Sequence, residues 1–377
     1  MKYTRYAKHF ISIYKSLLTD SVSNVFSITI ELLYKCNLRC KFCSRWKKEV
    51  HQNRELDVEV LCKRLYDLKK KYPAFSVSLT GGEPVLYSGF NQLLGFLEDN
   101  EILYGINTNA VKIEKLEKHL QDKRCNHCTA VMISLDSHTP AYHNKVRGVE
   151  GAFEKTIANI KRLKKFLVPV TIQTNLSSET LLEMGEYEKL AKKLGVNCRF
   201  QPIHENTATF KLEDESLKQV NNGYDELFDY IEKHCRQSGY DFITSCYYKM
   251  FPAFFMSPSC FPVSRCVSAA RLLYYITPKG DMLPCEDRRD IVLGDIYSKP
   301  IEQIIRAEKA RDFRRLCKHK EHGCFCLYAC VARHNEIFRF FPVITEPYLG
   351  FLTRRKWQKL FEQLRQCMKD GKRSSLQ

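Results

Sequence analysis

The chain has 377 residues, of which 44% are hydrophobic and 27% are charged. No run reaches the roughly 18 consecutive apolar residues that a membrane span needs, and the N-terminus lacks the apolar core of a secretory signal. These features argue against a membrane-spanning or secreted protein and predict a cytoplasmic one. In that compartment the 17 cysteines favour metal binding over a disulfide scaffold.

The chain is basic, with 60 Lys and Arg against 43 Asp and Glu and a net charge of +17. The positive charge is spread along the sequence, so it fits either an anionic partner or a solvated basic surface. No recognisable nucleic-acid-binding module accompanies it. We therefore expect no nucleic acid partner.

The first 24 residues place apolar side chains at near-helical spacing among Lys and Arg, which predicts an N-terminal amphipathic helix. We expect this helix to dock on the core, and peripheral contact with a membrane is the alternative. Short β-branched runs then alternate with helical stretches, the clearest of which are 57–71, 151–166 and 181–194. The expected strands are 26–33, 75–79, 104–108, 130–135, 170–174 and 198–203.

This alternation predicts an α/β fold with a parallel sheet, a partial (βα)6 TIM-like barrel over residues 25–240. Active-site residues should then cluster at the carboxyl ends of the strands. A smaller cysteine-rich domain is expected at residues 241–340, followed by a basic C-terminal helical extension at 341–377.

Three cysteines follow the first expected strand in a C-x3-C-x2-C loop, Cys36, Cys40 and Cys43. A short loop of this kind can bind three irons of a [4Fe-4S] cluster and leave the fourth iron without a protein ligand. An open coordination position is what separates a reactive metal centre from a structural one. The spacing therefore predicts a catalytic cluster, with a zinc site completed by a distant residue as the alternative.

Further motifs follow later strands. Thr80-Gly81-Gly82-Glu83-Pro84 comes after the second expected strand, and 107–110, 133–137 and 143–148 come after the third and fourth. Together with the cysteine loop they resemble the GGEP, T-N-G, S-L-D and H-D-x-x-R-G segments of the radical S-adenosylmethionine (SAM) superfamily. The chain departs from those patterns at Ala110, where Gly is usual, and at Asn144, where Asp is common.

The resemblance implies which residues contact SAM. Glu83 would accept from the methionyl amino group, Ser134 and Asp136 would lie near the ribose, and Arg147 would pair with the carboxylate. Residues 174–175 and 200–202 would border the adenine and the substrate. The implied set is Phe42, Gly81, Gly82, Glu83, Pro84, Asn107, Asn109, Ser134, Asp136 and Arg147.

The resemblance also implies a mechanism. The reduced cluster would cleave SAM to a 5′-deoxyadenosyl radical, which takes a hydrogen atom from the substrate. An external donor such as flavodoxin or ferredoxin would supply the electron. Cys36, Cys40 and Cys43 would be the catalytic cluster ligands.

A second group of cysteines lies in the C-terminal third of the chain. Cys266 and Cys285 flank a predicted hairpin at 272–283, and a helix is expected at 301–316. This arrangement resembles the SPASM and twitch domains, which bind auxiliary iron–sulfur clusters, although Lys320 stands where a further cysteine is usual. One or two clusters are implied, and zinc is the alternative. The candidate ligands are Cys260, Cys266, Cys285, Cys317, Cys324, Cys326 and Cys330.

The favoured function is a radical SAM enzyme that acts on a small-molecule or lipid-linked substrate, which the basic charge allows to be anionic. A net oxidation is expected by resemblance to twitch-type dehydrogenases. Only 35 residues precede Cys36, which disfavours an added leader-binding domain. The alternatives are a peptide-modifying maturase and a non-enzymatic iron–sulfur sensor or binding protein. Basic residues near the C-terminus, 354–356, permit contact with a membrane.

Overall fold

The structure is a computed structural model that describes residues 27–43, 45–46, 54–72, 75–122, 125–177, 180–203, 224–256, 266 and 268–319, and the isolated positions 362 and 366. Several predictions concern residues outside these ranges. They are the N-terminal helix, the C-terminal extension, and the ligands Cys260, Cys324, Cys326 and Cys330.

The described strands form one nine-stranded sheet in the order β6-β5-β4-β3-β2-β1-β7-β8-β9. The first six are parallel neighbours in chain order, which confirms the predicted partial barrel. These six strands are β1 (Ser27–Glu31), β2 (Ser76–Thr80), β3 (Leu103–Thr108), β4 (Cys128–Ser134), β5 (Val170–Leu176) and β6 (Asn197–Pro202).

Alternation along these strands separates an apolar face from a polar face. In β1, Ile28 and Ile30 are buried in the main core, whereas Ser27 and Thr29 line the interior of the barrel. The same period of two recurs in β2, because successive side chains of a strand point to opposite faces. The apolar face is covered by helices, and the polar face is left for the site.

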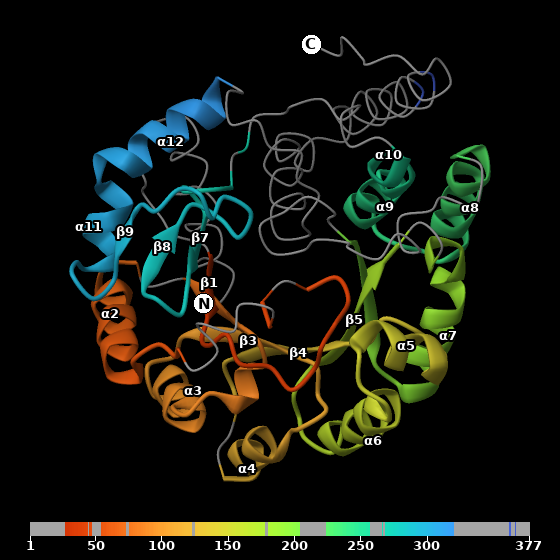
Figure 1. Cartoon of the computed structure of the whole chain (residues 1–377), viewed down its shortest axis with the longest axis horizontal. Coiled ribbons are helices and arrows are strands. Elements are labelled where there is room, and N and C mark those ends of the chain that lie inside the picture. Colours follow the sequence, from red (N-terminus) through yellow and green to blue (C-terminus); the bar gives the residue numbers. More distant parts are fainter. Residues whose placement is uncertain are drawn as a thin grey trace, which may run out of the picture.

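Helices surround the outer face of the sheet and pack against its apolar side chains (Figure 1). The first of them begins at Asp57, whose carboxylate accepts from the backbone N–H groups of Glu59 and Val60. The α-helices of the barrel region are α2 (Val58–Lys71), α3 (Phe90–Asp99), α4 (Glu114–Asp122), α5 (Pro140–Arg147), α6 (Ala152–Leu163), α7 (Met184–Leu194), α8 (Tyr224–Gln237), α9 (Phe242–Lys249) and α10 (Phe251–Met256). The short 3-10 helices η2 (Pro84–Leu86) and η3 (Thr180–Glu183) precede α3 and α7.

The C-terminal segment joins the barrel sheet. Strand β7 (Leu273–Ile276) pairs in parallel with β1, so β1 has a neighbour on both sides. The predicted hairpin is present, since β7 pairs in antiparallel fashion with β8 (Asp281–Leu283), which in turn pairs with β9 (Gly294–Asp295). The position of β7 beside β1 was not predicted, because strand pairing between distant segments leaves no local pattern in the sequence.

The helix expected at 301–316 is two helices, α11 (Ile301–Arg306) and α12 (Glu308–Lys318). Ala307 between them is extended, with φ −61° and ψ 157°. The buried guanidinium of Arg314 explains the break, because its Nη1 donates to the carbonyl of Ile305 at 3.2 Å and to that of Ala270 at 3.0 Å. One side chain thus satisfies a carbonyl at the end of α11 and ties the helix pair to the strand region.

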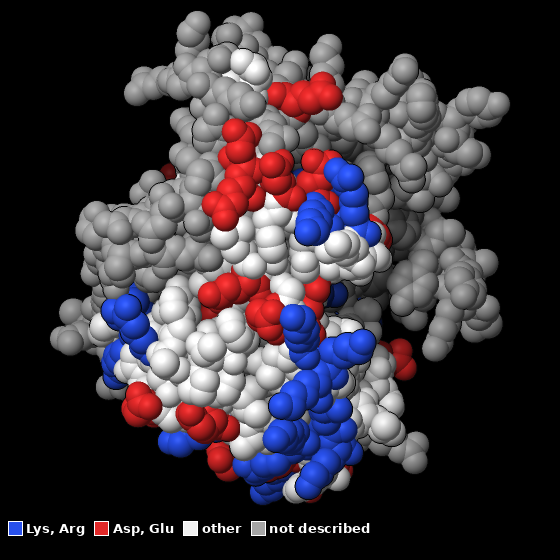
Figure 2. All heavy atoms as spheres, turned by 90° about the vertical axis from the view of Figure 1, so that its right-hand side faces the viewer, with Lys and Arg blue, Asp and Glu red and all other residues white. Residues whose placement is uncertain are grey.

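Charge is unevenly distributed over the face that carries α5 to α8. Lys and Arg gather in one stretch of this face, whereas Asp and Glu lie mainly elsewhere (Figure 2). Helices α6 and α7 both end in basic residues, Lys161 and Arg162 in one and Lys192 and Lys193 in the other. Cations in the last turn of a helix interact favourably with its dipole, so local helix chemistry accounts for part of the basic surface. Within the described part of the chain, every helix is too short or too polar to cross a bilayer.

We predict that Arg314→Met lowers the thermal stability of the protein, because it removes the side-chain donor to the Ile305 carbonyl, at a cost of about 1 to 3 kcal/mol. The Ala270 carbonyl also loses Arg314 but still accepts from the hydroxyl of Tyr274. The adjacent Arg315→Met is the matched control, since that side chain is 67% exposed and forms a surface ion pair with Asp312. Thermal unfolding of both variants checks the prediction. Equal unfolding temperatures for the two would contradict it.

Candidate active site

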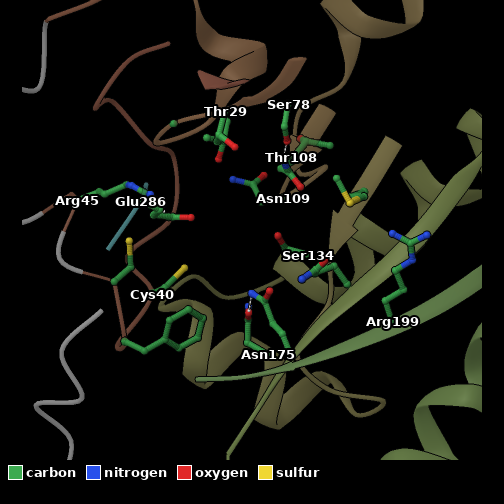
Figure 3. Close-up of a pocket in the computed structure, with 18 of the residues that line it drawn as sticks. Thr29, Cys40, Arg45, Ser78, Thr108, Asn109, Ser134, Asn175, Arg199 and Glu286 are labelled. Carbon is green, nitrogen blue, oxygen red and sulfur yellow. Dashed lines mark hydrogen bonds and ion pairs between the residues drawn. The ribbon is translucent and has the colours of Figure 1, made fainter. Parts of the chain in front are cut away.

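A cavity of about 560 Å³ lies against the interior of the barrel and the carboxyl ends of its strands. The three cysteines of the predicted triad all line it. In Figure 3, Cys40, Arg45 and Glu286 lie on one side, Arg199 lies across from them, and Ser134 and Asn175 lie between. The sequence therefore predicted the location of the site from the general geometry of parallel barrels.

The cysteine loop is held by the end of α5. The backbone N–H of Arg39 donates to the carbonyl of Arg147 at 3.0 Å, and that of Lys41 donates to Val146 at 2.9 Å. Gly148 permits this contact, because an added Cβ would lie 2.4 Å from the Arg39 carbonyl oxygen. The loop is thus fixed against a neighbouring helix rather than left on the surface.

The thiols of this loop are poor acids in the protein alone. Burial raises the pKa of Cys36 to about 11, and burial also raises the pKa of Cys40, to about 12. A metal centre reverses this preference, because its positive charge stabilises coordinating thiolates. Among the described residues, no three His, Cys, Asp or Glu side chains are arranged to hold one metal ion. A [4Fe-4S] cluster, in which each of the three thiolates would bind a different iron, is compatible with this loop.

The Gly81-Gly82-Glu83 turn packs directly on the chain that leads to the cysteine loop. The N–H of Gly82 donates to the carbonyl of Leu33 at 2.8 Å, and the N–H of Glu83 donates to that of Lys35 at 2.9 Å. A Cβ at position 82 would lie 2.2 Å from the Lys35 carbonyl oxygen. Gly82 is therefore required by the contact between two backbones.

Glu83 is a buried carboxylate at the wall of the cavity. It accepts hydrogen bonds from the hydroxyl of Thr108 at 2.7 Å, the N–H of Asn109 at 2.8 Å and the N–H of Val85 at 3.2 Å. Burial raises its pKa to about 7, although these hydrogen bonds and Arg147 oppose the shift. The amide of Asn109 also donates to Asn37, at 2.9 Å. These contacts join the ends of β2 and β3 to the cysteine loop.

Arg147 and Asp136 form a buried ion pair, with Nη2 and Oδ2 2.6 Å apart. The other terminal nitrogen of Arg147 lies 3.7 Å from the sulfur of Cys40, and its guanidinium lies 5.6 Å from the centre of the Phe42 ring. Asp136 also accepts from the backbone and the side-chain amide of Asn175, at 3.0 and 3.1 Å. Arg147 therefore links the ion pair to the cysteine loop.

The structure brings most of the predicted SAM contacts to one cavity. Those on its wall are Phe42, Gly81, Gly82, Glu83, Asn107, Asn109, Ser134 and Arg147. Pro84 and Asp136 lie behind the wall, and Asp136 reaches the site through Arg147. The amide of Asn107 donates to the hydroxyl of Ser78 at 2.8 Å.

Several wall residues were not predicted. Most point inward from the strands, and the period-two alternation could have identified these as the set opposite the apolar face. Others come from loops and helices far along the chain and carry no local signal. The unpredicted wall residues include Thr29, Arg45, Ser78, Thr108, Arg199, Thr244, Tyr247 and Glu286.

Three of the predicted auxiliary ligands are described. Cys285 and Cys317 are buried, and Cys266 is partly exposed. Burial raises the pKa of Cys285 well above its usual range, and the nearby thiol of Cys266 raises it further. These two cysteines are therefore neighbours, as the hairpin predicted.

Comparison with known families supports this site. A sequence model of the radical SAM superfamily matches residues 30–191, which contain the cysteine loop, the Gly-Gly-Glu turn and Arg147. The chain belongs to the radical SAM superfamily. A second model, of the SPASM iron–sulfur cluster-binding domain, matches residues 266–331. The two matches imply a [4Fe-4S] cluster with SAM, and auxiliary iron–sulfur binding in the C-terminal segment.

Three relatives span most of this radical SAM enzyme. The sporulation killing factor maturation protein SkfB of Bacillus subtilis is 24% identical over 303 residues, 79% of this chain and 68% of SkfB. The PqqA peptide cyclase of Gluconobacter oxydans is 22% identical, covering 80% and 85% of the two chains. The crystal structure of Streptococcus suis SuiB bound to the precursor peptide SuiA has a TM-score of 0.61 at 17% identity, covering 80% and 69%. This last likeness shows a shared fold.

We predict that Gly82→Ala separates the Gly-Gly-Glu turn from the cysteine loop, because the new Cβ meets backbone atoms that have no free space. A forced fit of this kind costs about 1 to 3 kcal/mol or more. Gly105→Ala is the control, since its Cβ would have ordinary contacts of 3.5 Å or longer. The expected result is a loss of iron and of thermal stability in Gly82→Ala alone. Full iron content in both variants would refute it.

Proposed function

We propose that this radical SAM enzyme modifies a peptide. The observation that carries the proposal is the polar inner face of the barrel. The comparisons favour a peptide over the small-molecule or lipid-linked substrate expected from the sequence, because one relative is named as a peptide cyclase and a similar structure, that of SuiB, holds a precursor peptide. SuiB is bound to a precursor peptide in its crystal structure, the named relative is the PqqA peptide cyclase, and SkfB is a maturation protein.

The inner face is lined mostly by small hydroxyl and amide side chains. A closed barrel fills this space with bulky branched residues, which leaves no room for a ligand. The side chains of this inner face carry hydrogen-bonding groups. A lipid tail could form no hydrogen bonds with these groups and would leave them unpaired. A peptide backbone offers the donors and acceptors that such a wall can satisfy. The inward residues are Ser27, Thr29, Ser78, Asn107, Met132, Ser134, Gln173, Asn175, Arg199 and Gln201.

The donor set fits the implied cofactors. Cys36, Cys40 and Cys43 would hold the cluster, and Glu83 would accept a hydrogen bond from the amino group of SAM. When bound, the cluster and SAM supply a 5′-deoxyadenosyl radical that removes a hydrogen atom from the substrate. Asn107, Asn109 and Ser134 on the neighbouring strand ends would orient SAM by hydrogen bonding.

The protein's own contribution is positioning and shielding. Arg147 would hold its charge beside Cys40 and the SAM carboxylate, and Asp136 fixes the guanidinium in place through their ion pair. Tyr247, Tyr248 and Phe200 on the opposite wall would exclude water from the reacting atoms. We assign Cys266 and Cys285 to an auxiliary cluster, with an external protein such as flavodoxin or ferredoxin as the electron donor.

We predict that SAM affinity falls as the pH drops from 7.5 to 6. The raised pKa of Glu83, about 7, means that its carboxylate becomes protonated over this interval and can no longer receive the ammonium of SAM. If SAM binds only the ionised form of Glu83, a pKa of about 7 raises the dissociation constant of SAM about eightfold between pH 7.5 and pH 6. Equilibrium binding of SAM to the anaerobic holoenzyme gives the measurement.

Glu83→Gln is the control for this titration. The affinity of this variant for SAM should be low at both pH values and should no longer change between them. A wild-type affinity that stays constant between pH 6 and 7.5 would remove Glu83 from the SAM site.

We predict that the holoenzyme changes the mass of a short peptide encoded near its gene and forms 5′-deoxyadenosine when that peptide is present. Co-production of the enzyme with each neighbouring peptide, followed by mass spectrometry, tests this. The Cys36, Cys40 and Cys43 triple alanine variant should give no product and should retain iron in the C-terminal segment. That iron should fall when Cys266 and Cys285 are also replaced.

The second candidate is a small-molecule or lipid-linked substrate. Stimulation of 5′-deoxyadenosine formation by a metabolite or lipid fraction, with no neighbouring peptide modified, would favour it and overturn the peptide assignment. Retention of SAM cleavage in the triple alanine variant would instead refute the catalytic role of the cysteine loop.

A further inference from the structure

Glu31, at the end of β1, is a completely buried carboxylate that no motif singles out. Its Oε1 lies 2.6 Å from Nε of Arg45, and its Oε2 lies 3.0 Å from Nη1 of Arg289. Burial alone would raise the pKa of Glu31, yet the two arginines hold it below its usual range. The residue is therefore charged and has two cationic partners.

The two arginines come from different cysteine loops. Arg45 is two residues beyond Cys43, and Arg289 is four residues beyond Cys285. Arg45 also reaches directly across, since its Nη2 lies 2.6 Å from the carboxylate of Glu286, the residue after Cys285. The buried carboxylate of Glu31 thus joins the loop of the three N-terminal cysteines to the loop that follows Cys285.

Tyr275 on β7 completes the group. Its hydroxyl accepts from Arg45 at 3.1 Å and from Arg289 at 2.9 Å. The guanidinium of Arg289 also lies over the Tyr275 ring, 4.9 Å from its centre. Because β7 lies beside β1 with Thr29 opposite Tyr275, the group spans the seam where the C-terminal segment joins the barrel.

Stability alone is a weak explanation for this arrangement. Two guanidinium groups and two carboxylates give a neutral set, but well-packed apolar residues at such a seam are often equally stable or more so. What a buried ion-pair group provides in addition is direction, because each oxygen of the Glu31 carboxylate faces a different arginine, and few relative placements of the two loops allow this. The cavity wall includes both Arg45 and Glu286, so the orientation of this group shapes the site.

We propose that Glu31 is a positioning residue that clamps the two cysteine loops to each other, so that the catalytic cluster and the auxiliary site keep one relative placement. Its carboxylate acts through Arg45 on one loop and through Arg289 on the other. Loosening either contact loosens both loops. This role does not depend on which substrate the enzyme modifies.

Hydrogen–deuterium exchange of the anaerobic holoenzyme tests the clamp. In Glu31→Gln, exchange should rise by at least about threefold in peptides covering residues 36–46 and 281–291 together, because local opening of both loops becomes easier. Peptides of β4 to β6 should exchange as in the wild type. Loosening of residues 36–46 alone, or a rise throughout the molecule, would overturn the proposal.

Two further variants sharpen the test. Arg289→Lys keeps the positive charge and loses the guanidinium fork, and it should loosen residues 36–46 although it lies in the other loop. This variant provides the test if Glu31→Gln does not fold. Unchanged exchange of residues 36–46 in Arg289→Lys would overturn the clamp. Glu98→Gln is the control, since Glu98 is a largely buried carboxylate, 7% exposed, that accepts from residues 126 and 127. Loosening of both cysteine loops by this control would also refute the proposal.

A spectroscopic readout separates positioning from support of the fold. The electron paramagnetic resonance spectrum of the fully reduced holoenzyme depends on the distance and orientation between its paramagnetic clusters. Glu31→Gln should alter this interaction at wild-type iron content, and Glu98→Gln should not. An unchanged spectrum in Glu31→Gln would show that the loops keep their placement without the clamp.

Discussion

The contact between the exits of β1 and β2 is the constraint on which the rest of the site depends. Beyond the strands, Gly82 and Glu83 continue to hydrogen-bond the backbone at Leu33 and Lys35. This contact places the Glu83 carboxylate beside the chain that enters the cysteine loop. The glycine pair therefore serves backbone packing first.

Opposing charges surround the cysteine loop in a medium of low polarity. Glu83 lies on one side with its pKa raised, and the Arg147–Asp136 pair lies on another with Arg147 directed at Cys40. The buried thiols alone disfavour ionisation, so binding of iron to them must release protons. Arg147 is the charge that favours thiolate in the protein itself, since it lowers the pKa of Cys40 against the effect of burial.

The sequence predicted the elements whose signals are local. The strands are short β-branched runs, the helical stretches carry apolar residues three and four apart, and the cysteine spacing marks the loop after the first strand. Side-chain pairing over long distances was not predictable in the same way. The family motifs assign Asp136 and Arg147 separate ligand contacts, whereas the structure joins them in an ion pair. Glu31 occupies an ordinary inward position of a strand, and its importance depends on Arg289, which lies 258 residues away along the chain. The break at Ala307 likewise depends on Arg314 reaching a carbonyl of the preceding helix.

The partial barrel combines an open interior with a fixed cysteine loop. The open interior follows from the inward hydroxyl and amide side chains, which leave space that branched apolar residues would fill. The fixed loop follows from the place of β1 in the sheet, because β2 and β7 pair with it on both sides. If β1 were an edge strand, the cysteine loop would leave the least constrained part of the sheet. Strand β7 thus contributes rigidity to the catalytic loop from a segment that also carries the second group of cysteines.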